Sequence, residues 1–288
     1  MLGIEMKNVT KNFGSTCALD DVSLRIDGKK IYGLLGNNGA GKTTLLNIMT
    51  NRLYADAGEV IIDGERAADN DRALGKLFMM GEQNLYPEDL RVKKAFKITA
   101  QFYPEFDLNY ANRLAEMFGL NVKKKITSLS TGYSSIFRLI LALSVNTPYL
   151  LLDEPVLGLD ARHRDMFYKM LIEKYAENEC TIIISTHLIQ EVSNLIEHTL
   201  IIRDGRIIKD MPRETLLADS YTVSGPAGLV EKYISGREVI SASSLGGLKT
   251  ACLQGQPERS DLSPGLEIGS VNLQDYFISL MNGKDENK

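Results

Sequence analysis

Up to about residue 210, short apolar runs alternate with longer segments whose apolar positions follow the spacing of a helix. The segments 92–103 and 108–118 have helical spacing, and Pro104 separates them as a helix breaker does. The later apolar runs are continuous rather than alternating, which is typical of central parallel strands covered on both faces. Strands are therefore predicted at residues 4–10, 22–26, 30–35, 76–80, 149–153 and 181–185. The pattern predicts an α/β protein with a helical insert.

The composition of the chain changes after about residue 214, where glycine, serine and proline are concentrated at 224–226, 243–247 and 256–261. Apolar runs persist between these turns, at 229–234, 238–240 and 273–280. A disordered linker would not keep such runs, so we expect a small folded α+β appendage. The predicted domains are residues 1–215 and an accessory domain at 216–288.

Composition narrows the class of protein. The chain has 288 residues, 44% of them hydrophobic and 24% charged, with a net charge of −4, which is typical of a soluble globular protein. It has neither the roughly 20 consecutive apolar residues of a membrane span nor a secretory leader, so we expect a cytoplasmic protein. The acidic balance gives no reason to expect nucleic-acid binding. Three widely spaced cysteines, Cys17, Cys180 and Cys252, fit reduced thiols.

The strongest chemical signal follows the strand predicted at 30–35. It matches the phosphate-loop pattern G-x-x-x-x-G-K-[ST]. Its glycines let successive backbone N–H groups point at a phosphate chain, and the start of the next helix adds its positive dipole end. Lys42 would contact the β- and γ-phosphates, and the Thr43 hydroxyl would bind Mg²⁺. The candidate ATP-binding residues of this loop are Gly36, Asn37, Asn38, Gly39, Ala40, Gly41, Lys42, Thr43 and Thr44.

A second signal lies at the end of the strand predicted at 149–153, where Asp153 and Glu154 are adjacent. Alone, either residue would be an ordinary strand-end carboxylate. Beside a phosphate loop, Asp153 can support Mg²⁺ and Glu154 can polarise an attacking water.

Together these motifs resemble the ATP-binding subunit of an ABC transporter, over about residues 3–215. The signature position of that family matches 129–133, Leu-Ser-Thr-Gly-Tyr; the D-loop matches 158–160; and the switch-histidine segment matches 185–187. Phe13 matches the adenine-stacking aromatic. The resemblance implies a P-loop ABC cassette with a mixed sheet core, an antiparallel β part and a helical subdomain at about 85–147, followed by the small α+β appendage.

The resemblance also implies roles for residues outside the phosphate loop. Glu154 and His187 would be catalytic, and Thr43, Gln83 and Asp153 would bind Mg²⁺. Phe13, Ser130, Gly132 and Asp160 would contact ATP, with Ser130 and Gly132 facing the γ-phosphate held by the other subunit of a dimer. Cofactors are thus ATP and Mg²⁺, and the enzyme is an ATPase.

Two positions depart from the family pattern. The signature has Thr131 and Tyr133 where its commonest form has glycine and glutamine, which puts a normal hydrolysis rate in doubt. The glutamine expected after the strand at 76–80 has three candidates, Gly81, Glu82 and Gln83; we choose Gln83 and keep Glu82 open because a carboxylate also suits Mg²⁺.

The implied partners are a second ATP-binding subunit, identical or related, and an integral membrane permease, which would hold the chain at the inner face of the cell membrane. The divergent signature and the appendage resemble exporters of antibiotics and lantibiotics. A nutrient importer is the alternative within transport, and a soluble ABC ATPase acting on ribosomes or DNA is the alternative outside it. The basic run Lys123–Lys125 lies just before the signature, where a solvated charge run is the simpler interpretation.

Overall fold

The computed structural model describes residues 3–83, 85–87, 89–178, 180–258 and 262–282. The chain divides into two compact units. The first extends to His187 and resumes at 198–210, and the second combines 188–197 with the chain from Met211 onward. The second unit therefore includes, besides the C-terminal region, a ten-residue segment that directly follows His187 in sequence.

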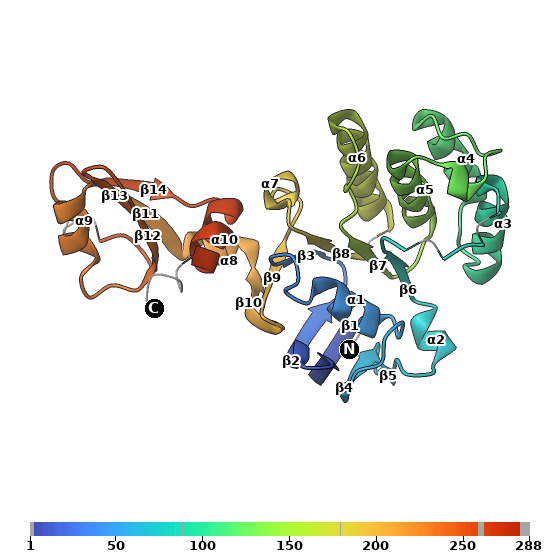
Figure 1. Cartoon of the computed structure of the whole chain (residues 1–288), viewed down its shortest axis with the longest axis horizontal. Helices are drawn as coiled ribbons and strands as arrows, with labels where there is room; N and C mark the ends of the chain where they lie inside the picture. Colours follow the sequence, from blue (N-terminus) through green and yellow to red (C-terminus); the bar gives the residue numbers. More distant parts are fainter. Residues whose placement is uncertain (1–2, 84, 88, 179, 259–261, 283–288) are drawn as a thin grey trace. The chain divides into compact units, whose positions relative to one another are not determined.

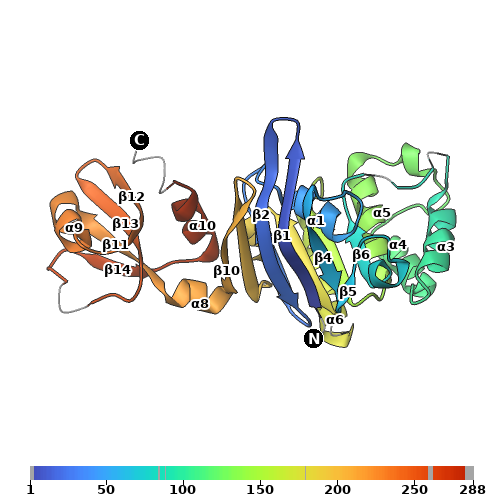
Figure 2. The same ribbon diagram turned by 90° about the horizontal axis from the view of Figure 1, so that it is seen from below.

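An antiparallel sheet forms the N-terminal part of the first unit. Its strand order is β2 (Thr16–Asp27), β1 (Gly3–Phe13), β4 (Ala57–Ile62), β5 (Glu65–Arg66). Along the second half of β2 every other residue is buried, because one face of the sheet packs on the core and the other faces solvent. Figure 2 shows β1 and β2 as a long hairpin that carries Phe13 near its turn.

The second sheet is mostly parallel and supports the site. Its order is β10 (Arg206–Pro212), β9 (His198–Arg203), β3 (Ile31–Leu35), β8 (Thr181–Thr186), β7 (Tyr149–Asp153), β6 (Leu77–Met80). All residues of β3, β7 and β8 are buried, as their continuous apolar runs predict. Because these three strands run parallel side by side, their carboxyl ends meet at one edge of the sheet.

Helices surround this sheet (Figure 1). Helix α1 (Lys42–Met49) follows β3, and α6 (Ala161–Asn178) connects β7 to β8. The predicted insert consists of α3 (Val92–Phe102), α4 (Leu108–Met117), the 3₁₀ turn η1 (Ile126–Ser128) and α5 (Thr131–Ser144), while α2 (Asp71–Leu74) precedes β6. One core joins both sheets through α1, since Leu45 and Leu46 pack with Met6 of β1 and Leu151 of β7.

The second unit is built on a small antiparallel sheet. Its order is β12 (Val239–Leu245), β13 (Leu248–Gln254), β11 (Ser220–Pro226), β14 (Glu267–Ser270). Helix α9 (Ala227–Ile234) packs on one face around Tyr221 and Leu253. Helix α10 (Leu273–Asn282) contacts β12, α8 (Arg213–Ala218) and α7 (Ile189–Val192). The unit has the α+β composition expected of the appendage, but it begins at Met211 and includes 188–197, beyond the predicted bounds of 216–288.

The predicted fold class is confirmed: the first unit combines a mixed sheet, an antiparallel sheet and a helical insert, as a P-loop ABC cassette does. Among the described residues, none of the helices has both the length and the apolar composition needed to cross a bilayer.

Candidate active site

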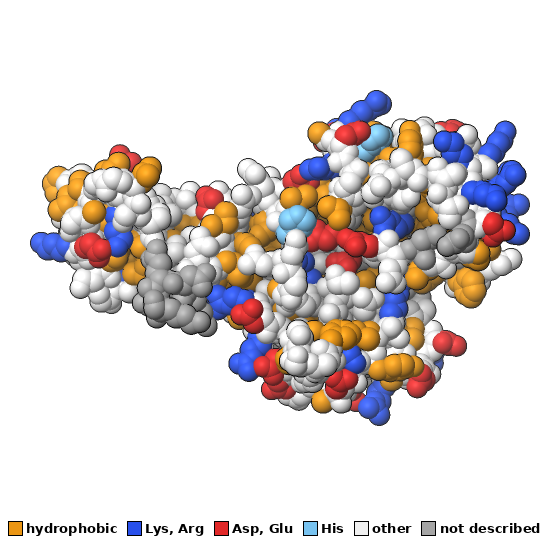
Figure 3. All heavy atoms as spheres, viewed as in Figure 1, with side chains coloured by type: hydrophobic (Ala, Val, Ile, Leu, Met, Phe, Trp, Pro, Cys, Tyr) orange, Lys and Arg blue, Asp and Glu red, His pale blue; other side chains and the backbone are white. Residues whose placement is uncertain are grey.

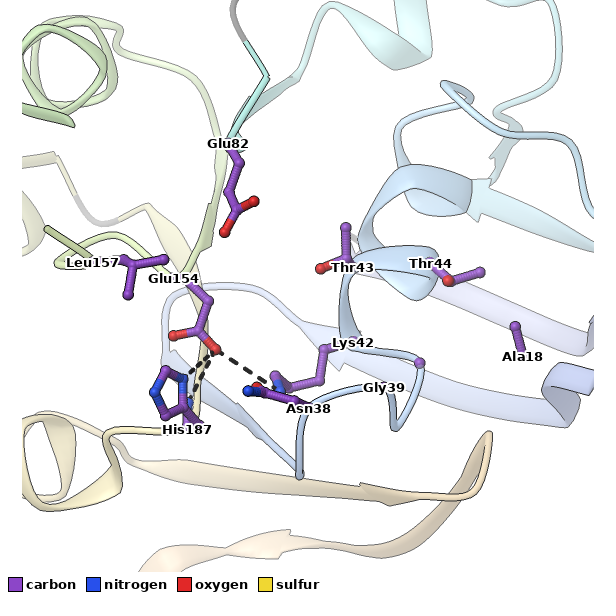
Figure 4. A pocket seen from close by; sticks show the side chains of 11 residues that line it. Ala18, Asn38, Gly39, Lys42, Thr43, Thr44, Glu82, Glu154, Leu157 and His187 are labelled. Atoms are coloured by element: carbon purple, nitrogen blue, oxygen red, sulfur yellow. Dashed lines mark hydrogen bonds and ion pairs between the residues drawn. The ribbon is translucent and has the colours of Figure 1, made fainter. Parts of the chain in front are cut away.

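A cavity of about 510 Å³ lies where the carboxyl ends of β3, β7 and β8 meet. This volume is within the usual range for a site that holds a small organic ligand. Six residues of the predicted phosphate loop line it, whereas Gly36, Asn37 and Ala40 do not. The other lining residues are Ala18, Glu82, Glu154, Leu157 and His187. Figure 4 shows Lys42 and Asn38 on one side of the cavity, facing Glu154 and His187 on the other.

The turn from β3 into α1 requires glycine at two positions. Gly39 and Gly41 have φ angles of 80° and 110°, which L-residues with a side chain rarely adopt. Gly41 is also the N-cap of α1, so no side chain caps the helix. The amide groups of the first helical turn therefore remain available to an anion, with the positive end of the helix dipole behind them.

These two glycines give a matched pair of substitutions. A Cβ at Gly41 would lie 2.6 Å from the carbonyl oxygen of Ala18, whereas a Cβ at Gly39 meets nothing within 4 Å. We expect Gly41→Ala to lower the free energy of unfolding by about 3 kcal/mol or more, and Gly39→Ala by only about 1 kcal/mol. Urea denaturation without nucleotide measures both, and equal losses would refute the close approach at Gly41.

Lys42 is the buried cation of the site. It is only 6% exposed, and its ammonium group donates hydrogen bonds to the carbonyl oxygens of Gly36 at 2.7 Å and Asn37 at 3.1 Å. Burial lowers the pKa of Lys42, an effect that the carboxylates of Glu154 and Asp153 partly offset. The side chain thus places a positive charge over the mouth of the phosphate loop, 3.8 Å from Glu154.

Asp153 ends β7 beside the loop. Its carboxylate accepts hydrogen bonds from the hydroxyls of Thr43 at 2.7 Å and Ser185 at 2.8 Å. Hydroxyl and carboxylate oxygens are the hard ligands that Mg²⁺ prefers, and Mg²⁺ usually keeps waters and binds substrate phosphates rather than requiring many carboxylates. The oxygen donors of Thr43 and Asp153 therefore suit Mg²⁺, although the described residues contain no group of three or more acidic, histidine or cysteine ligands.

Glu154 and His187 form a pair. One oxygen of the Glu154 carboxylate accepts hydrogen bonds from the backbone N–H of His187 at 3.1 Å and contacts His187 Nδ1 at 2.9 Å. The other oxygen accepts from the Thr186 hydroxyl at 3.1 Å. Glu154 has a φ of 46°, a strained conformation for a residue with a side chain. The fold thus fixes a carboxylate in the cavity at a conformational cost, which is typical of functional sites.

The loop after β6 brings Glu82, rather than Gln83, to the wall of this cavity. Gln83 and Gly81 instead line a neighbouring groove of about 120 Å³. Arg138 of α5 holds the loop, donating to the carbonyl oxygens of Gly81 at 3.0 Å and of Glu82. The choice of Gln83 as Mg²⁺ ligand is not favoured by this placement. Sequence analysis did not identify Arg138, since no motif marks it.

The remaining predicted ATP contacts lie outside the cavity wall. Ser130 is the N-cap of α5 and accepts a hydrogen bond from the amide of Tyr133 at 3.4 Å. Gly132 is half-buried on the first turn of the same helix. Asp160 caps α6, where the His163 amide lowers the pKa of its carboxyl group. Phe13 is 51% exposed on the β1–β2 hairpin, which also carries Ala18 of the cavity wall. Their contacts with nucleotide stay predictions.

The arrangement can bind a polyphosphate and activate water. A helix start without a cap and Lys42 supply positive charge for phosphate oxygens. The carboxylates of Glu82, Asp153 and Glu154 would repel a triphosphate unless a cation lay between them, which again favours Mg²⁺. Glu154 is left on the open side, paired with a histidine, where it can accept a proton from water.

Comparisons with known proteins agree with this chemistry. The family described as "ABC transporter" matches residues 19–157. The ABC transporter ATP-binding protein YtrB of Bacillus subtilis is 30% identical over 213 residues, 74% of this chain and 73% of its own length. The petrobactin import ATP-binding protein YclP of Bacillus subtilis is 30% identical over 75% of this chain and 90% of its own.

One further similarity extends over nearly the whole chain, and another concerns the fold. The bacitracin transport ATP-binding protein BcrA of Bacillus licheniformis is 25% identical over 97% of both chains, the C-terminal region included. A solved dimeric ATP-binding cassette in a post-hydrolysis state, bound to ADP and phosphate, matches 73% of this chain and 98% of its own with a TM-score of 0.64 at 24% identity. The chain therefore belongs to the ATP-binding subunits of ABC transporters, a family of ATPases that work with permeases in the membrane, and is itself an ATPase.

Proposed function

We propose that two copies of this chain bind two ATP molecules between them and drive a separate permease that exports peptides or drugs. The observation that carries this proposal is the contact of Glu154 with His187 beside Lys42, because it combines a general base with a phosphate-binding cation in one cavity. The dimer and the permease are inferred from residues that do not line this cavity.

The signature residues support a dimer. Ser130 is exposed and Gly132 half-buried at the start of a long helix, yet they do not line the cavity of their own chain. A helix start attracts anions, so these residues suit the γ-phosphate held by a second subunit. Since this chain carries both a complete phosphate loop and a signature, two copies would form two equivalent sites. We therefore propose a homodimer rather than a heterodimer.

In this site each residue has a distinct task. Lys42 and the start of α1 bind the phosphates, and Glu154 accepts the proton of the attacking water. His187 holds the Glu154 carboxylate through its backbone N–H and ring nitrogen. Thr43 and Asp153 would hold Mg²⁺, with Glu82 as the third candidate in place of Gln83. When bound, Mg²⁺ neutralises the charge that develops on the phosphate oxygens.

The permease would dock in the groove of about 120 Å³ between β6 and α5. Its wall is mostly apolar and includes the aromatic residues Phe78, Tyr86, Tyr103 and Phe137, which suits an apolar helix of a partner. Arg138 links this groove to the cavity: it binds the carbonyl oxygen of Glu82 and also donates to Ser135, which donates in turn to Leu157 of the cavity wall. A movement of the residues that line the groove would thus be transmitted through Arg138 to the ATP site.

Export is favoured by the similarity to BcrA, named for bacitracin transport, because it extends over 97% of the chain and so includes the appendage. Import is the runner-up, supported by the similarity to YclP, named for petrobactin import, over 75% of the chain. A role on ribosomes or DNA has less support, since the chain has a single phosphate loop and a net charge of −4.

Purification of the tagged chain from gently solubilised membranes tests the transport proposal. We expect a polytopic membrane protein in stoichiometric amount, and we expect it to be lost when Leu85→Asp and Tyr86→Asp place charges in the groove, where Leu85 is exposed. Lys169→Asp, exposed on α6, serves as the control that keeps the complex. Ribosomal proteins or nucleic acid in its place would refute a role in transport.

A further inference from the structure

A basic patch forms where two separate segments of the helical insert meet. Backbone hydrogen bonds join them, from Val92 N to Lys124 O at 3.1 Å and from Lys93 N to Val122 O at 2.9 Å, and Arg91 pairs with Lys125. Lysine and arginine gather over this region at the α3 end of the molecule in Figure 3. The basic patch comprises the exposed residues Arg91, Lys93, Lys94, Lys97, Lys123, Lys124 and Lys125.

No carboxylate among the described residues pairs with this patch. Within the described part of the chain, ion pairs up to 4.0 Å join many other lysines and arginines to carboxylates but none of these seven. Nearby in sequence or packing are the exposed acids Asp89 and, on α4, Glu116. Lys93 and Lys94 also lie in the first turn of α3, which has no acidic residue, so the helix dipole opposes them. Seven cations are thus kept together against their own repulsion in a chain of net charge −4.

The inference that the basic patch lies near a bilayer rests on the proposed function, in which the chain binds a membrane permease. Helix α3 carries the patch at its start, and its Thr99 bonds the Tyr86 hydroxyl of the permease groove at 2.6 Å. A permease seated in that groove spans the bilayer, so α3 would lie close to the inner leaflet. The basic charge of the patch complements the negative surface potential that anionic lipids give this leaflet.

We propose that the basic patch binds the anionic phospholipid headgroups around the permease. Clusters of four to eight lysines and arginines suffice for such binding, each adding roughly a factor of five to affinity near the surface. Six of the seven residues are lysines. Lysine acts as a mobile point charge, which suits a fluid array of headgroups better than one fixed phosphate. The subunit would then be held at the membrane by direct lipid contacts as well as by the permease.

Co-sedimentation of the full chain with vesicles tests this proposal. The test variant is Lys94→Gln, Lys97→Gln, Lys124→Gln, and the control is Lys7→Gln, Arg66→Gln, Arg72→Gln, three exposed cations elsewhere whose loss changes the net charge equally. We expect binding to vesicles with about 30% phosphatidylglycerol, no binding to pure phosphatidylcholine, and loss at about 0.5 M salt. The test variant should bind about a hundredfold more weakly, and the control as the natural chain does.

Equal binding by the test variant and the natural chain, or equal binding to both kinds of vesicle, would overturn the proposal. Tighter binding of a single-stranded oligonucleotide than of phosphatidylglycerol vesicles at the same salt would assign the patch to nucleic acid instead. A second variant, with all three residues of Lys123–Lys125 changed to glutamine, leaves α3 intact and should lose binding likewise. ATPase activity without the permease should be unchanged in every variant, and the membrane partner is detected separately, so failure here leaves the proposed function standing.

Discussion

Replacement of Glu154 by glutamine should lower steady-state ATP hydrolysis at least about a hundredfold and leave ATP binding intact, because it removes the general base without removing a phosphate contact. The amide keeps the size of the carboxylate: its oxygen can still accept from the His187 amide, and its NH₂ group can donate to the Thr186 hydroxyl. Phosphate release measures the turnover, and equilibrium binding of a fluorescent ATP analogue measures the affinity.

A second carboxylate serves as the matched control. Glu177→Gln changes an exposed residue near the end of α6, outside the cavity, and should hydrolyse ATP at the rate of the natural chain. If Glu154→Gln retained that rate as well, Glu154 would not be the base, and the carboxylate of Glu82 would be the next candidate in the cavity.

Lys42→Ala has the second largest expected effect, a loss of ATP affinity of roughly a hundredfold. A charged hydrogen bond is worth about 1.5–3 kcal/mol, and the ammonium group faces the mouth of the phosphate loop. The change removes a buried charge whose pKa burial lowers, but it also leaves the largely buried carboxylate of Glu154 without its cation. We expect the free energy of unfolding without nucleotide to fall by about 3 kcal/mol.

Thermal unfolding with and without ATP separates these two effects. The natural chain should gain about 2.7 kcal/mol of stability at ATP concentrations a hundredfold above its dissociation constant, and the Lys42→Ala chain almost none. Lys169→Ala, on the exposed surface of α6, is the control and should respond to ATP as the natural chain does. A full ATP-dependent gain in the Lys42 variant would mean that the loop does not bind the phosphates.

The sequence predicts the sheet core well where residues are buried on all sides. β3, β7 and β8 have nothing but buried positions, so their apolar runs are visible without knowing their neighbours. The pattern does not predict β10, because most of its positions are half-exposed. It also misses β9, although the four central residues of that strand are buried. The grouping of 188–197 with the C-terminal unit depends on packing of α7 with α10, which no local pattern encodes.

For the candidate site, motifs of contiguous residues can be found in the sequence, whereas contacts between residues far apart in the chain cannot. The phosphate loop is one uninterrupted run, whereas the contact of Glu154 with His187 joins residues 33 positions apart. The position of Glu82 is set by Arg138 of α5, 56 residues later in the chain. The basic patch likewise needs two distant segments, of which the sequence drew attention only to Lys123–Lys125.

The central claim, that ATP is bound between two copies of this chain, is tested most directly by the mass of the Glu154→Gln protein in solution. Light scattering should give the mass of the monomer, 32.0 kDa, without nucleotide and twice that mass with ATP and Mg²⁺, because bound ATP is not hydrolysed. A mass that stays at the monomer value when ATP is bound, or that is already doubled without ATP, would contradict the account.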